Sequence, residues 1–361
     1  MLTTMADIDC FIQGAGVISP QRTYDNREFL PEVTHHDSHV LTCIPPDFKQ
    51  YFSPMQLRRL GRMPRMVLAA AAICLDDAGV SNVDAIITAT GYGAQEDMAK
   101  FLDEMLDRNE QQPAPASFIQ SGYNAMAGLL AMQLKCTGYN NNFVSRGFAF
   151  ETALHDAVLY LREKEADRVL LGAFDDASPQ QYGEYIRLGY FKKERTDHRA
   201  LFESRTAGTL QGEGVALFLL SAGRTPENLC RIGDFRMVYR PADYGVLSRE
   251  LNGFLEANDL TAGDVDVFVN GISGDAARDR WNLALQRDCF THAAEVRFKH
   301  LTGEYATASS FALWLGAEIL KKQTIPQAVL GTHIPHRRPL RTALVCNHFL
   351  GKNYSFFLLT S

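Results

Sequence analysis

Apolar residues along this chain follow two patterns, which predict alternating strands and helices. Continuous apolar runs predict buried strands at residues 11–18, 85–89, 169–171, 215–220 and 265–269. Residues 150–161 carry apolar side chains at steps of three and four, which is typical of a helix with one buried face. The Ala- and Leu-rich segment 66–78 ends at Gly79, a common helix stop. This alternation predicts an α/β protein whose sheets are covered on both faces.

A similar order of elements occurs twice along the chain. Residues 75–91 contain a helix end, a loop with Asp84, an apolar strand and a closing glycine. Residues 255–271 repeat that order with Asp264, 180 positions later. The repeat predicts two α/β halves that share one core, and five layers if the halves stack.

Composition excludes several classes of protein. The 361 residues carry a net charge of −6 and contain no apolar run of eighteen residues, which argues against a nucleic-acid partner and a membrane span. The seven cysteines are scattered and form no CxxC pair, so we interpret them as buried small residues in a cytoplasmic protein, with no metal site. His35, His36 and His39 with Asp37 are interpreted as a solvated loop rather than metal ligands. An acidic carrier protein would require a local basic patch, which the sequence does not locate.

Four short motifs occur in a defined order, at residues 14–20 (GAGVISP), 212–216 (GEGVA), 298–303 (FKHLTG) and 347–353 (NHFLGKN). In this order and spacing, the chain resembles the ketoacyl synthase branch of the thiolase-like superfamily along nearly its whole length. The resemblance implies a duplicated thiolase-like fold with five layers, αβαβα. It also implies one compact unit made of an N-terminal half at 1–225 and a C-terminal half at 226–361.

A working synthase of this family uses a cysteine nucleophile and two histidines, and none of the three is found at its matching position. The cysteine falls on Gly147, the first histidine on Asn270 and the second on Glu304. Glycine forms no acyl-enzyme, an amide carries no imidazolium charge, and a carboxylate repels the enolate of the substrate. We therefore expect no catalytic residues, and we expect the retained Lys299 to pair with Glu304 or another acid. His348 is not expected to be catalytic.

The resemblance implies a role as chain-length factor, the non-catalytic subunit that pairs with an active ketosynthase in type II polyketide or polyene biosynthesis. Chain-length factors often carry glutamine at the cysteine position, so Gly147 departs from that pattern. The implied partners are the catalytic ketosynthase subunit and, transiently, an acyl carrier protein, with no cofactor. Two sets of residues follow from this role. The tunnel set is Phe118, Ser121, Tyr123 and Phe349, and the interface set is Asn141, Asn142, Phe143, Val144, Ser145 and Arg146.

Several alternatives stay open at this stage. Phe118 and Tyr123 are equally interpreted as core aromatics, Phe349 as packing, and the asparagines at 140–142 as a turn. An atypical acyltransferase or decarboxylase would use Glu304 as a base with Lys299 nearby, acting on carrier-bound acyl groups. A homodimeric binding protein for acyl chains or carrier proteins is the third hypothesis.

Overall fold

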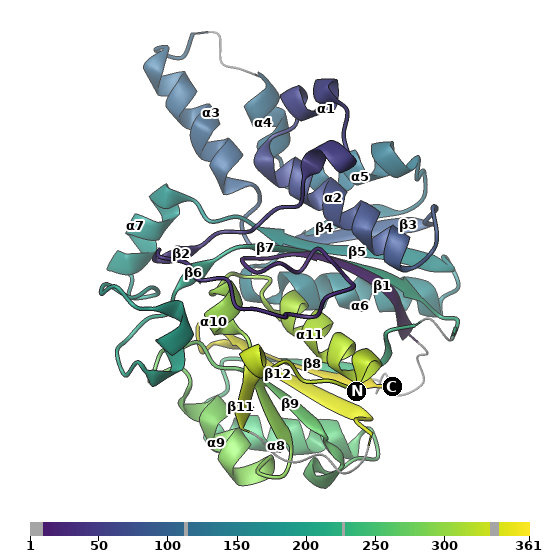
Figure 1. Cartoon of the computed structure of the whole chain (residues 1–361), viewed down its shortest axis with the longest axis vertical. Coiled ribbons are helices and arrows are strands. Elements are labelled where there is room, and N and C mark those ends of the chain that lie inside the picture. The colour runs from purple at the N-terminus through teal and green to yellow at the C-terminus, as the bar shows by residue number, and fades with distance from the viewer. Residues whose placement is uncertain (1–9, 112–114, 226–227, 333–338) are drawn as a thin grey trace.

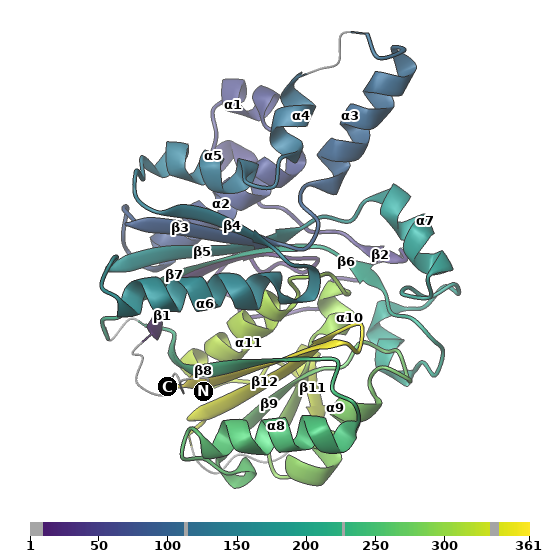
Figure 2. The same ribbon diagram turned by 180° about the vertical axis from the view of Figure 1, so that it is seen from behind.

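Two sheets and three layers of helices alternate through the molecule (Figure 1, Figure 2). The computed structural model describes residues 10–111, 115–225, 228–332 and 339–361. None of the helices in the described ranges is both long and apolar enough to cross a membrane.

The first sheet is built from the N-terminal part of the chain. Its strands, in spatial order, are β1 (Cys10–Ile18), β7 (Gly214–Ser221), β5 (Arg168–Asp175), β3 (Ala85–Thr90) and β4 (Asn140–Val144). The inner strands β3 and β5 are almost entirely buried, which explains their continuous apolar runs. β3 pairs in parallel with both β4 and β5, and β4 has no further neighbour in the described part of the sheet.

The second sheet is built from the C-terminal part of the chain. Its strands, in spatial order, are β11 (Leu330–Thr332), β10 (Ala294–Arg297), β9 (Val267–Gly271), β12 (Thr342–Phe349), β13 (Asn353–Thr360) and β8 (Cys230–Tyr239). β1 pairs with β8 over Cys10–Ile12, so backbone hydrogen bonds connect the two sheets at one edge. A separate small sheet joins β2 (Val40–Leu41) to β6 (Gln211–Gly212).

The helices fill the space above, between and below the two sheets. They are α1 (Pro54–Arg59), α2 (Arg62–Asp77), α3 (Gln95–Asp107), α4 (Pro115–Ser121), α5 (Ala125–Leu134), α6 (Ala149–Arg162), α7 (Pro179–Arg187), α8 (Tyr244–Glu256), α9 (Arg280–Cys289), α10 (Lys299–Thr302) and α11 (Ser309–Lys322). In both views α2 and α5 cover the first sheet, α6 and α11 lie between the sheets, and α8 and α9 cover the second sheet. α11 is buried on all sides from Ser309 to Leu320, as expected for a helix in the central layer. The thiolase-like fold with five layers, αβαβα, is therefore confirmed.

The central layer ties the two sheets together through side chains. Phe150 of α6 lies 5.9 Å from Phe218 of β7 and 6.1 Å from Phe357 of β13, measured between ring centroids. One continuous apolar cluster includes residues from Cys10 to Leu359. The division into halves at 1–225 and 226–361 stays a prediction, although β7 and β8 belong to different sheets.

The elements agree with the predicted ones. The predicted strands and helices are all present, with ends shifted by up to four residues. The segment 115–128, which contains the predicted tunnel residues Phe118, Ser121 and Tyr123, forms two helices, α4 and α5. Asn140–Asn142 lie in β4, so the alternative of a turn is wrong. The cysteines are free, and five of them are buried, at positions 10, 43, 74, 230 and 346.

Two of the sequence motifs meet in space. Gly212, in the motif at 212–216, packs so closely on the backbone of Thr302 that a Cβ at Gly212 would collide with the Thr302 carbonyl oxygen. The neighbouring Glu213 is buried, accepts a hydrogen bond from the Cys43 backbone N–H at 2.6 Å and forms an ion pair with Arg62. The motif therefore has a structural role, which is to fasten α2 and α10 to the end of β7.

Candidate functional site

The site forms at the N-terminal end of α6, where the chain turns from β4 into the helix. The turn consists of Arg146, Gly147 and Phe148, and Gly147 is buried. A Cβ placed on Gly147 would lie 2.5 Å from Cδ1 and 2.8 Å from Cβ of Phe349. The phenyl ring therefore occupies the volume that any side chain at position 147 would need.

A small pocket lies beside Phe349. It leaves about 20 Å³ of free space, which is room for about one water molecule and far less than an acyl chain requires. Its walls are aromatic and acidic, and none of the described lysines, arginines or histidines lines it. The lining residues are Tyr92, Asp175, Asp176, Tyr185, Tyr190, Phe191, Gln211, Gly212, Glu304, Tyr305, Ala306, Phe349 and Leu350.

The three carboxyl groups of the pocket are buried, and burial raises the pKa of each. The pKa of Asp176 reaches about 7, although the backbone N–H groups of Gln95 and Glu96 donate to its two oxygens at 3.0 and 2.9 Å. Asp175 also has a raised pKa, and it accepts four hydrogen bonds that tie together β3, β5 and the loop before α11. A pocket with this lining disfavours a carboxylate or an enolate.

Glu304 forms the ion pair with Lys299 that the sequence led us to expect. Lys299 Nζ lies 2.8 Å from Glu304 Oε2 and donates a second hydrogen bond to the carbonyl oxygen of His348 at 2.6 Å. Both side chains are buried, and burial raises the pKa of Glu304 although the Lys299 ammonium opposes the shift. The second carboxylate oxygen, Oε1, has no hydrogen-bond partner in the described part of the chain.

His348 is fully buried and is held by two opposing contacts. Its Nε2 lies 2.9 Å from Asp279 Oδ1, and its Nδ1 accepts the Gly351 backbone N–H at 3.2 Å. The ring therefore carries its proton on Nε2 and donates it to Asp279. Burial alone would raise the pKa of Asp279, but hydrogen bonds from His348 and Ser273 lower it overall. His348 does not line the pocket, and these contacts fix it as a structural residue.

Asn270, at the predicted place of the first histidine, is not brought to the pocket. Its amide donates to Glu295 Oε1 at 2.8 Å and its carbonyl accepts from Asn282 at 3.1 Å. The structure thus brings together Gly147, Glu304 and Phe349, and it places Asn270 in a buried polar network on β9 instead.

The predicted tunnel residues other than Phe349 lie apart from the pocket. Phe118 and Tyr123 are 59% and 55% exposed, so their interpretation as core aromatics is wrong. Ser121 is buried and donates to the Phe118 carbonyl oxygen at 2.8 Å. The role of Phe118, Ser121 and Tyr123 in a partner's tunnel stays a prediction.

The predicted interface segment is only partly a strand. Asn141, Asn142, Phe143 and Val144 belong to β4 at the end of the first sheet, whereas Ser145 and Arg146 belong to the turn before α6. Thr88 of β3 donates to the Asn142 side chain at 2.7 Å, which anchors the strand on its inner side.

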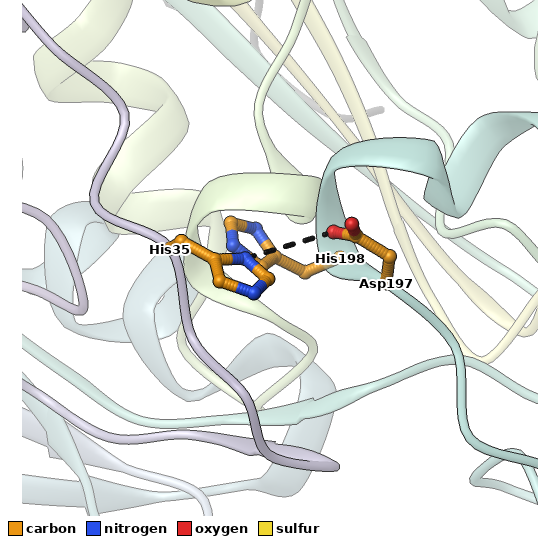
Figure 3. Close-up of side chains that lie close together, drawn as sticks. All are labelled: His35, Asp197 and His198. Carbon is orange, nitrogen blue, oxygen red and sulfur yellow. Dashed lines mark ion pairs between the residues drawn. The ribbon is translucent and has the colours of Figure 1, made fainter.

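A second cluster of polar side chains lies away from the pocket. His35, Asp197 and His198 have ligand atoms within 4.8 Å of one another (Figure 3). Both ring nitrogens of His198 are already used: Nδ1 bonds the His300 carbonyl oxygen at 2.7 Å and Nε2 accepts the His36 N–H at 3.1 Å. Asp197 is paired with Arg199 as well. These contacts give the cluster a structural role in joining the loop at 35–37 to the segment at 197–199.

Sequence reasoning missed the tyrosines and two of the acids of the pocket. Asp175 and Asp176 directly follow the apolar part of β5, and consecutive acids at the end of a buried strand were the available signal. Tyr92 and Tyr190 carried no such signal, because they come from loops that meet only in the folded chain.

A comparison with known families decides the relationship. Residues 42–194, which contain the turn at Gly147, match the family described as beta-ketoacyl synthase, N-terminal domain. Over this N-terminal part, the chain matches the beta-ketoacyl synthase family. No curated protein matches its sequence.

Solved ketosynthase structures share the fold of this chain over 98% of its length and 99% of their own length. The ishigamide ketosynthase/chain length factor is 17% identical with a TM-score of 0.79. A type II PKS acyl-carrier protein in complex with its ketosynthase bound to the hexaketide is 15% identical, with a TM-score of 0.77. A beta-ketoacyl synthase from Burkholderia phymatum is 15% identical, with a TM-score of 0.75.

Proposed function

We propose that this chain is a non-catalytic ketosynthase-like subunit, a chain-length factor, which pairs with an active ketosynthase and shapes the acyl tunnel in type II polyketide or polyene biosynthesis. The observation that carries the proposal is the contact between Gly147 and Phe349. The nucleophile's position has no side chain, and its space is filled by an aromatic ring. A pocket with room for about one water accepts no acyl chain, so the subunit acts through its surface.

Exposed apolar side chains on α3 and α4 support a partner subunit. Thirteen large apolar side chains are exposed in the described ranges, and nine of them fall between residues 55 and 144. They include Met98, Leu102 and Leu106, which recur every four residues and form a stripe along α3. Phe118 and Ile119 of α4 are exposed beside that helix, since the Phe118 ring lies 5.1 Å from that of Phe101. Apolar surface concentrated in one region is typical of an interface.

The relatives in the comparisons agree with this partnership. One similar structure is a ketosynthase/chain length factor, and another is an acyl-carrier protein in complex with its ketosynthase. By analogy, we infer that the catalytic ketosynthase is a stable partner of this chain and that an acyl carrier protein contacts the pair transiently.

The catalytic alternative is disfavoured by the state of Glu304. A general base must reach the proton it removes, but Glu304 is buried, paired with Lys299 and enclosed in a pocket that admits about one water. The homodimeric alternative is a binding protein for acyl chains or carrier proteins, in which the same exposed surface would pair two copies of this chain.

Native mass spectrometry tests the proposal on the full chain, alone and with the ketosynthase encoded nearest to it. We expect a one-to-one heterodimer in which acyl or malonyl adducts are confined to the other subunit. Leu102→Glu should weaken the heterodimer at least tenfold, equivalent to about 1.4 kcal/mol, because it places a charge in the apolar stripe. Leu283→Glu is the matched control, since Leu283 is similarly exposed (41% against 49%) but lies on α9.

Two results would overturn the proposal. One is a stable homodimer that takes up an acyl group itself and loses that activity in Glu304→Ala, which would make the chain an enzyme. The other is a homodimer that ignores the synthase and binds acyl chains or carrier proteins without reacting.

A further inference from the structure

A basic groove lies next to the acidic pocket and shares Tyr92, Tyr190, Phe349 and Leu350 with it. The groove encloses about 630 Å³, which is in the range of small-molecule sites. Among the residues that the structure describes, three cations and no acidic residue line the groove. The other lining residues are Ser145, Phe148, Tyr239 and Asn353, with Arg146, Arg240 and Lys352 as the cations.

The three cations come from three separate segments. Arg146 follows β4, Arg240 follows β8, and Lys352 lies in the turn between β12 and β13. The Arg240 backbone N–H donates to the Lys352 carbonyl oxygen at 2.7 Å, which fixes two of these segments against each other. Positive charge is thus gathered here by the tertiary fold, which explains why no basic patch is visible in the sequence.

None of the three cations is neutralised within the described part of the chain. No described carboxylate lies within 4.0 Å of Arg146, Arg240 or Lys352. Each cation lies instead over a tyrosine ring, at 5.8 Å for Arg146 on Tyr92, 5.7 Å for Arg240 on Tyr239 and 5.8 Å for Lys352 on Tyr190. A ring face orients a cation without cancelling its charge, so the hydrogen-bond donors stay available for an anion.

The backbone of the groove is also unusual. Arg146, Arg240 and Leu350 have φ values of 45°, 46° and 53°, which place three lining residues that are not glycine in the left-handed region. Such conformations carry a cost that surrounding structure must sustain, and they gather at binding sites. Two of the three are the arginines themselves, so the strained positions are those that present the guanidinium groups.

We propose that this groove is an anion site for a small molecule that carries a phosphoryl group beside a flat apolar group. Two planar guanidinium groups and one ammonium match the oxygens of a phosphate dianion. The edges of Phe148 and the three tyrosines offer apolar contact to the attached group. The acidic pocket behind the groove repels the anion and so keeps it at the mouth. This site goes beyond the proposed function. Ser145 and Arg146 of the groove also belong to the predicted interface segment, so the site is tested on the chain without a partner subunit.

Isothermal titration calorimetry of the full chain with phenyl phosphate at fixed ionic strength tests the proposal. We expect binding to the wild type, and at least fivefold weaker binding to Arg240→Gln and to Lys352→Gln, because each removes one cation from the site. Lys164→Gln is the matched control, since Lys164 is exposed beyond the C-terminal end of α6, about 21 Å along the helix from the groove. The free energy of unfolding of each variant separates loss of binding from loss of fold.

The probes also define what would overturn the site. Benzyl alcohol lacks the charge and benzoate carries a carboxylate, so the first should not bind and the second should bind more weakly than phenyl phosphate. No binding of phenyl phosphate to the wild type would sink the proposal. So would equal affinity in the wild type and both groove variants, or benzoate binding as tightly as the phosphate.

Discussion

Gly147 and Phe349 compete for one volume although 202 positions separate them in the chain. A reaction centre at the N-terminus of α6 would need a side chain there, and the phenyl ring prevents one. The sequence predicts that position 147 lacks a nucleophile. It does not show that the space has been filled, because that depends on how β12 packs against the turn before α6.

Gly147→Cys should therefore destabilise the chain instead of restoring a nucleophile. Forcing a side chain into a filled site typically costs about 1–3 kcal/mol. The control is Gly128→Cys, because a Cβ at Gly128 of α5 meets nothing within 4 Å and should leave the stability unchanged. Urea denaturation measures both. Adding Phe349→Ala should remove most of the penalty of Gly147→Cys, and a penalty that persists would show that Phe349 is not its cause.

Glu151 is the other residue of α6 with an unusual environment. It is buried in the central layer, and burial raises its pKa from 4.5 to about 7, while Ser309 and Ser355 lower it only in part. The folded chain thus binds this proton more tightly than the unfolded chain does. Ionisation of Glu151 therefore destabilises the fold progressively as the pH rises from about 4.5 to about 7. Above pH 7 this loss of stability is complete and no longer changes with pH.

Glu151→Gln should remove that dependence, because glutamine has no proton to lose. At pH 8 the variant should exceed the wild type in free energy of unfolding by on the order of 1–3 kcal/mol, and at pH 4.5 the gain should be close to zero. Urea denaturation at both pH values measures it, with exposed Glu165→Gln as the control. A gain that is equal at both pH values would show that Glu151 does not titrate in this range.

At the level of elements, the buried strands and the amphipathic α6 were predictable because their patterns follow directly from burial. β3 and β5 have both faces covered, so their apolar runs are continuous, and α6 shows a buried face at three- and four-residue steps. The break between α4 and α5 was missed because Gly122 and Asn124 are separated by Tyr123, a residue suited to a helix or a core. Tyr123 is exposed because of where the folded chain places it, and the local sequence pattern does not indicate this.

The candidate site was predictable only where a motif carried it. Gly147, Glu304, Lys299 and Phe349 lie in segments that resemble a known family, and the ion pair between Lys299 and Glu304 was confirmed. The aromatic and acidic lining of the pocket and the three cations of the groove come from separate strands, helices and loops with no shared spacing. Positions of that kind are fixed by the tertiary fold, which one sequence without its structure does not specify.

At the level of the whole molecule, the central layer makes the two sheets interdependent. Phe150 lies in α6, between its contacts to Phe218 in the first sheet and Phe357 in the second. α11 is buried on every side between the same sheets, and β1 bonds directly to β8. If either half unfolded, the core residues of the other half would be exposed to water. The two halves should therefore unfold together.

Phe150→Ala tests this interdependence. Removing a fully buried phenyl ring should lower the free energy of unfolding by about 3–5 kcal/mol. Because the ring contacts both sheets, hydrogen exchange followed by mass spectrometry should show the protection of β3 and of β12 falling by the same amount. Leu285→Ala is the control for a cavity on one side only, since Leu285 is equally buried but belongs to the cluster beneath the second sheet. Leu285→Ala should also lower the protection of β3 and of β12 by equal amounts if unfolding is a single event. Loss of protection in β12 alone would instead show that the C-terminal half opens independently, and would favour two separable domains over one unit.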